Sequence, residues 1–98
     1  MTKFIALFKR PENIEEFDKH YSEVHTPLII KTPGMEKIIV TRISGSPMGE
    51  SPYYLMAEMY FKDAAAFKAA SASPEWRAAG KDLMSFAGPL VTMMIGEE

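Results

Sequence analysis

The stretch KFIALFKRPENIEEF, residues 3–17, contains a strand, a break and the beginning of a helix. Within residues 3–8, all side chains after Lys3 are apolar and alternate between two faces, which predicts a strand that is covered on both sides. Pro11 interrupts this strand. Asn13, followed three residues later by Glu16, resembles a helix-capping box and predicts that a helix begins here.

The helix that starts after Asn13 has an apolar stripe at spacings of three and four residues, formed by Ile14, Phe17, Tyr21, Val24 and Leu28. Pro27 disfavours helical geometry at the residue before it. We therefore expect the regular helix to end near His25. The pair Pro33-Gly34 then predicts a turn.

Three more strands and two more helices are predicted. Alternating side chains indicate strands at residues 35–43, 53–61 and 90–95. Asp63 is expected to cap a short helix that ends near Ala72, and Ser73 followed by Pro74 indicates the start of another. The resulting order of strand, helix, strand, strand, helix pair, strand is typical of a ferredoxin-like α+β sandwich. In that split βαβ fold, a four-stranded antiparallel sheet carries helices on one face, here as a single domain over residues 1–98.

The sheet face without helices bears on the assembly of the protein. Both faces of all four predicted strands carry large apolar side chains, such as Ile5 and Leu7 on the face opposite Phe4. A patch of this size exceeds what soluble monomers usually expose. We therefore expect a homodimer in which two copies pack through their sheets.

The composition excludes several classes of function. The 98 residues include 11 Lys and Arg and 13 Asp and Glu, and the basic residues do not cluster, so no nucleic acid is expected as a partner. The most apolar segment, Leu90–Ile95, is far shorter than the roughly 20 residues that cross a bilayer, so no membrane is expected either. The chain shows no signal-peptide pattern, which predicts a cytoplasmic protein.

The two histidines are the natural candidates for chemistry, because histidine titrates near neutrality. His20 and His25 are five residues apart, which separates them by about 140° around an α-helix and disfavours a shared metal ion. His20 is expected at the surface, one turn after Glu16. His25 lies at the helix end beside Tyr21 and is a candidate general acid or base, or else a histidine that only bonds local backbone. Asp82 is expected to be a solvated charge.

Four further side chains are candidates for the wall of a binding site. We expect Trp76, Phe17, Tyr54 and Met56 to contact an apolar ligand, although ordinary core packing explains such residues equally well. The eight methionines suit an adaptable apolar cavity, and methionine is also a common core residue.

Several motifs together resemble a known family: Tyr21-x-x-x-His25-x-Pro27-Leu28, Lys31-x-Pro33-Gly34, and Ala70-x-Ala72-Ser73-Pro74-Glu75-Trp76 with Asp82 and Phe86. Over essentially its whole length the chain is similar to the EthD family, which is named for its association with ethyl tert-butyl ether degradation. The resemblance implies a dimeric α+β barrel of ferredoxin-like subunits. It also implies that His25 and Tyr21 form a pair facing the pocket, and it suggests an oxidoreductase or an accessory protein of ether catabolism.

The leading functional hypothesis is an enzyme without a cofactor that acts on a small apolar organic molecule in catabolism, resembling either a monooxygenase or an isomerase. His25 would act as acid or base, and Tyr21 would orient it or donate a hydrogen bond to a developing oxyanion. The alternative is a non-catalytic dimeric protein that binds or delivers a hydrophobic metabolite. Haem binding is a third possibility, but nothing distinguishes His25 as an axial ligand.

Overall fold

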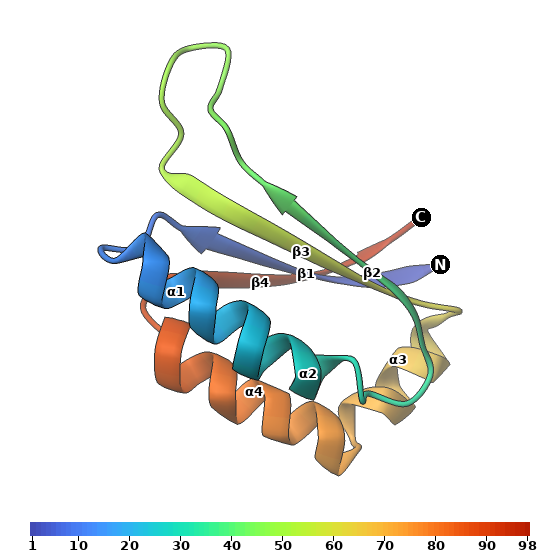
Figure 1. Cartoon of the computed structure of the whole chain (residues 1–98). Coiled ribbons are helices and arrows are strands. Elements are labelled where there is room, and N and C mark those ends of the chain that lie inside the picture. Colours follow the sequence, from blue (N-terminus) through green and yellow to red (C-terminus); the bar gives the residue numbers. More distant parts are fainter.

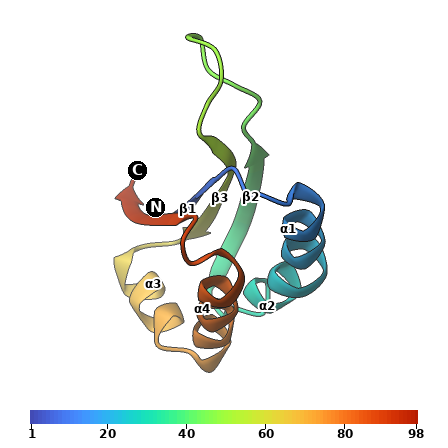
Figure 2. The same ribbon diagram turned by 90° about the vertical axis from the view of Figure 1, so that its left-hand side faces the viewer.

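The computed structural model describes residues 1–98 and contains one antiparallel sheet with strand order β2–β3–β1–β4 (Figure 1). The strands are β1 (Thr2–Lys9), β2 (Met35–Arg42), β3 (Tyr53–Phe61) and β4 (Val91–Glu97). The helical segments are α1 (Ile14–His20), η1 (Tyr21–His25), α2 (Thr26–Ile29), α3 (Ala64–Ser71) and α4 (Pro74–Ala87). All the helices lie on one face of the sheet (Figure 2). The predicted ferredoxin-like sandwich is therefore confirmed.

The predicted helix starts are also confirmed. The side chains of Asn13, Asp63 and Ser73 each accept a hydrogen bond from the backbone N–H three residues further on. These bonds satisfy amides that have no partner within the helix. The longest helix, α4, has 14 residues, and no helix is long and apolar enough to cross a membrane.

The predicted end of the first helix near His25 is wrong, because the chain stays helical to Ile29. Residues Tyr21–His25 form a wide π-turn, in which the N–H of Thr26 donates to the carbonyl of Tyr21. In a regular α-helix the ring of Pro27 would collide with the carbonyl four residues earlier. The wider turn relieves this collision, so the helix passes the proline as α2.

The π-turn also changes which side chains are buried. The buried residues of the first helix recur every four positions: Phe17, Tyr21, His25 and Ile29. In a regular α-helix a step of four residues drifts by about 40° per turn, so such a row would leave the core-facing side. The extra residue in the wide turn offsets that drift. Val24, which the expected stripe included, is 42% exposed instead.

The core fills the space between the helices and the adjacent sheet face. Phe8 on β1 and Phe61 on β3 are fully buried at its two ends. The ring of Phe8 contacts Phe17 and Tyr21 at centroid distances of 5.4 and 5.8 Å. These contacts join the first helix to the sheet.

The other face of the sheet is less uniformly apolar than expected. The strand register places Ile39, Glu58, Ile5 and Met94 in one row across it. Glu58 is paired with Lys3 at 3.0 Å, while Ile39 and Met94 are 39% and 41% exposed. This face is therefore an apolar surface that contains an ion pair.

We predict that Ser73→Ala lowers the free energy of unfolding by about 1 kcal/mol, because it leaves an amide at the start of α4 without its cap. Ser73 Oγ accepts from the Trp76 N–H at 3.1 Å and also donates to the Ala70 carbonyl. Urea denaturation measures the change. Ser71→Ala, within α3, is the matched control and should stay within about 0.5 kcal/mol of wild type. Equal stabilities for the two variants would contradict the capping role.

Candidate active site

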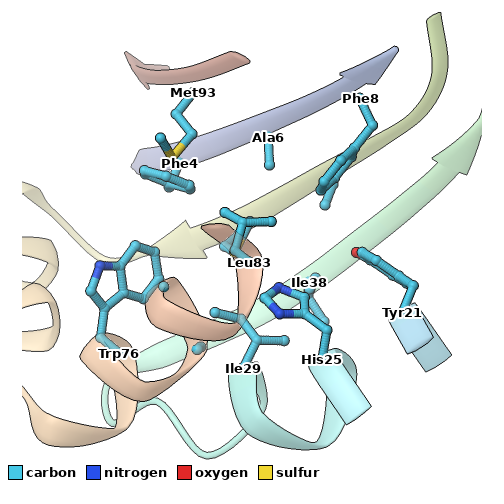
Figure 3. A pocket seen from close by; sticks show the side chains of 14 residues that line it. Phe4, Ala6, Phe8, Tyr21, His25, Ile29, Ile38, Trp76, Leu83 and Met93 are labelled. Carbon is cyan, nitrogen blue, oxygen red and sulfur yellow. The ribbon is translucent and has the colours of Figure 1, made fainter. Parts of the chain in front are cut away.

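A small apolar cavity of about 70 Å³ lies between the sheet, the first helix and α4 (Figure 3). Of its 14 lining residues, 12 are hydrophobic, and none is Asp, Glu, Lys or Arg. Trp76 stands at one end of the cavity, with Tyr21 and His25 at the other (Figure 3). The only polar side chains in the lining are those of Tyr21, His25 and Trp76, so the chemistry of the cavity is concentrated in very few groups.

His25 combines burial with a specific hydrogen bond. The residue is 6% exposed, and its Nδ1 lies 3.1 Å from Oδ2 of Asp82 on α4. Because an ionised carboxylate only accepts hydrogen bonds, we assign the imidazole proton to Nδ1. Nε2 has no partner within the protein and keeps its lone pair, on a ring that lines the cavity. His25 can therefore accept a proton from a molecule bound there.

The surroundings of His25 favour its neutral form. Burial lowers its pKa below the usual 6.5, and this effect outweighs the opposing hydrogen bond and attraction from Asp82. At pH 7 the side chain is therefore neutral, as a general base must be.

Tyr21 lies one turn before His25, and the centroids of the two rings are 5.6 Å apart. Burial raises the pKa of Tyr21 to about 12, so its hydroxyl stays protonated. This hydroxyl makes no hydrogen bond within the protein. It can therefore donate one to a bound molecule, which gives the cavity one donor beside one base.

Asp82 belongs to the candidate site, and the sequence analysis missed it. The expectation of a solvated charge is wrong, because its side chain is only 13% exposed and both of its oxygens are bonded to histidines. The sequence did contain a signal that Asp82 is partly buried. Asp82 is three residues after Ala79 and four before Phe86, so it borders the apolar stripe of α4.

His20 is likewise not a simple surface residue. Its Nε2 lies 2.8 Å from Oδ1 of Asp82, and its ring packs against Phe86 at 4.2 Å. The expected divergence of His20 and His25 assumed regular α-helix, and the π-turn between them brings both to the same carboxylate. The three side chains form a row with Asp82 in the middle, and they are not arranged as the ligands of a metal ion.

Of the four expected wall residues, the structure places only Trp76 at the cavity. Phe17 is buried in the core beside the cavity. Met56 pairs with Leu7 and lies on the opposite face of the sheet. The remaining walls come from both layers, and they include Ile29 on α2, Leu83 on α4, and Phe4, Ile38 and Met93 on the strands (Figure 3).

Tyr54 also lies outside the cavity, for a reason found in the strand register. Phe8 pairs with Leu55 and Lys9 with Tyr53, so Tyr54 is the extra residue of a bulge in β3. Its hydroxyl donates to the carboxylate of Asp18 on α1 at 2.8 Å. Tyr54 thus fastens the first helix to the sheet.

Comparison with known proteins identifies close similarities. The profile of the family described as "EthD domain" matches residues 9–89. The crystal structure of an ethyl tert-butyl ether degradation (EthD) family protein from Bacillus halodurans is 53% identical, with a TM-score of 0.97 over 100% of this chain and 98% of that one. An uncharacterised 11.0 kDa protein of the thcB-thcC intergenic region of Rhodococcus erythropolis is 30% identical over 100% of this chain and 95% of its own length.

More distant solved structures share the fold. A dimeric ferredoxin-like protein of unknown function from Jannaschia sp. has a TM-score of 0.72 at 15% identity, covering 100% of both chains. SnoaB from Streptomyces nogalater, a cofactor-independent oxygenase, has a TM-score of 0.64 at 19% identity, covering 97% of this chain and 87% of that one. At these identities the likeness concerns the architecture alone.

We predict that acidification destabilises the protein partly through His25. Because burial lowers the pKa of His25 in the folded state, the unfolded chain binds a proton at higher pH than the folded one. Stability is therefore complete above about pH 6.5 and is lost as the pH falls below it. His25→Gln removes this titration, so its stability should depend less steeply on pH between 7.5 and 5. Thermal unfolding at several pH values tests this, and parallel curves for wild type and variant would contradict it.

Proposed function

Since the chain belongs to the EthD family, we propose that it is a cofactor-independent enzyme that removes a proton from a small, neutral, mostly apolar organic molecule. The observation that carries this proposal is the neutral imidazole of His25 in an apolar cavity. Its Nδ1 is hydrogen-bonded to the carboxylate of Asp82, and its Nε2 is free. The same constellation of base and orienting carboxylate activates histidine in many enzymes.

The lining of the cavity defines the class of substrate. No charged side chain lines it, so a carboxylate or ammonium group would lose its hydration without compensation. The hydroxyl of Tyr21 and Nε2 of His25 instead suit a molecule that carries a carbonyl oxygen and an acidic proton nearby. The volume of about 70 Å³ is small, so a larger substrate requires Met93, which is 47% exposed on β4, to move aside.

The proposed reaction begins with proton transfer to Nε2 of His25. The C–H bond beside the carbonyl breaks, its electron pair moves onto the carbonyl oxygen, and the Tyr21 hydroxyl stabilises the resulting oxyanion. Where a C=C bond lies next to the carbon that loses the proton, the anion is delocalised to the far end of that bond, and return of the proton from His25 to this far carbon makes the enzyme an isomerase. Alternatively, the same anion forms a C–O bond with dioxygen as co-substrate, and the outer peroxide oxygen takes the proton back from His25 to give a hydroperoxide. The substrate is then oxidised by two electrons and dioxygen is reduced to the peroxide level, so the enzyme would be an oxidoreductase. SnoaB, which shares this fold, is described as a cofactor-independent oxygenase.

We also propose that the protein is a homodimer joined through the sheet face opposite the helices. The exposed Ile39 and Met94 lie there in one row with Ile5, and the charge of Glu58 is balanced by Lys3. Covering this face removes apolar surface from water. The description of a protein with this fold as dimeric supports a dimeric state.

The catalytic proposal is tested by hydrogen–deuterium exchange, which needs no knowledge of the complete reaction. A panel of small neutral ketones, unsaturated lactones and hydroxyquinones is incubated with the protein in D₂O and followed by proton NMR. Wild type should accelerate exchange of at least one compound. His25→Ala should lower that rate by about 10²- to 10⁴-fold, and Asp82→Asn should lower it through the wrong imidazole tautomer.

Lys81→Gln is the matched control, because Lys81 is exposed next to Asp82 on α4, and its rate should equal that of wild type. An unchanged rate in His25→Ala would contradict the proposal. Binding of a compound without exchange, with equal affinity in His25→Asn, would instead favour the alternative of a non-catalytic protein that binds a hydrophobic metabolite.

The dimer is tested by light scattering at micromolar concentration. Wild type should have twice the mass of the chain. Ile39→Lys combined with Met94→Lys places two charges on the proposed contact and should yield monomers. Met84→Lys, at a 54% exposed position on α4, is the control and should remain dimeric. A monomeric wild type would contradict the dimer.

A further inference from the structure

Asp82 lies between two different spaces on the helical side of the molecule. His25, on one side of it, lines the apolar cavity. His20, on the other side, lines an open and mostly polar groove between α1 and the segment where α4 leads into β4. The row His20–Asp82–His25 therefore connects the outside of the protein with the proposed site.

The two hydrogen bonds use different oxygens of the carboxylate. His20 Nε2 bonds Oδ1 at 2.8 Å, and His25 Nδ1 bonds Oδ2 at 3.1 Å. The terminal torsion of an aspartate is broad, so one bond alone does not fix the carboxylate plane. Two bonds on opposite oxygens do fix it. The shorter of the two is the bond to His20.

His20 is itself held in place. Its ring lies 4.2 Å from that of Phe86, one helical turn beyond Asp82, and its side chain is 33% exposed. The other charged residues that line the groove are Glu12, Glu16, Lys19 and Glu23, and none of them forms an ion pair with Asp82 or with either imidazole. His20 is thus the outer support of Asp82.

We propose that His20 is a positioning residue of the site. By donating a hydrogen bond to Oδ1 of Asp82, it orients Oδ2 towards His25. This orientation holds His25 in the tautomer whose free Nε2 faces the cavity. The effect of this tautomer preference on turnover rests on the proposed function. The tautomer preference itself is a property of the free protein.

The tautomer preference of His25 is tested without a substrate by ¹⁵N NMR of the imidazole rings in the free protein at pH 8. Wild type should show His25 as a single species protonated at Nδ1. His20→Leu packs on Phe86 but donates no hydrogen bond, and it should give His25 a mixture that includes the Nε2-protonated form. His20→Gln keeps an N–H donor and should restore the single species. Lys19→Gln is the matched control on the same helix and should match wild type.

A single Nδ1-protonated species in His20→Leu would overturn the proposal, and so would a mixture in His20→Gln. Should His20→Leu not fold, His20→Asn replaces it, because its amide is too short to reach Asp82. In the exchange assay, His20→Leu should lower kcat about tenfold with little change in KM, and His20→Gln should restore it. Absence of exchange in wild type would refute the proposed function alone, since the tautomer measurement decides the role of His20 independently.

Discussion

The carboxylate of Asp82, shared by two imidazoles, is the interaction on which the site depends. It joins α4 to the first helix, and its side chain is only 13% exposed. A charged group with so little exposure is costly unless its oxygens are hydrogen-bonded, and each of these oxygens has a bond. The same bonds that make the charge tolerable determine which nitrogen of His25 faces the cavity.

That arrangement requires the π-turn at Tyr21–His25. A regular α-helix would direct His20 and His25 about 140° apart, and only one of them could reach Asp82. The turn also keeps Tyr21 and His25 in the buried row, so the donor and the base face the same space. Isolated π-turns occur often at functional sites, and here the turn supplies the geometry of the site directly.

Local signals predicted most of the fold. Asn13, Asp63 and Ser73 cap helices through contacts within a few residues, and alternating side chains mark the strands, so these features can be identified from sequence. The site was predicted less completely. Its π-turn arises from a conflict between a proline and the helix that contains it, and the partnership of Asp82 with His25 joins residues 57 positions apart. The bulge that turns Tyr54 towards Asp18 depends on the pairing of two strands, which no single segment encodes.

The cavity and the sheet face have separate proposed roles. We propose the sheet face for assembly, whereas His25, Tyr21 and Asp82 all come from one chain and need no second copy to meet. Neutron diffraction from crystals grown in D₂O above pH 7 decides which nitrogen of His25 carries the proton, because it locates the deuterons. We predict a deuteron on Nδ1, between the ring and Asp82, and none on Nε2. A deuteron on Nε2 with a bare Nδ1 would contradict the proposed role of His25, because no base would then face the cavity.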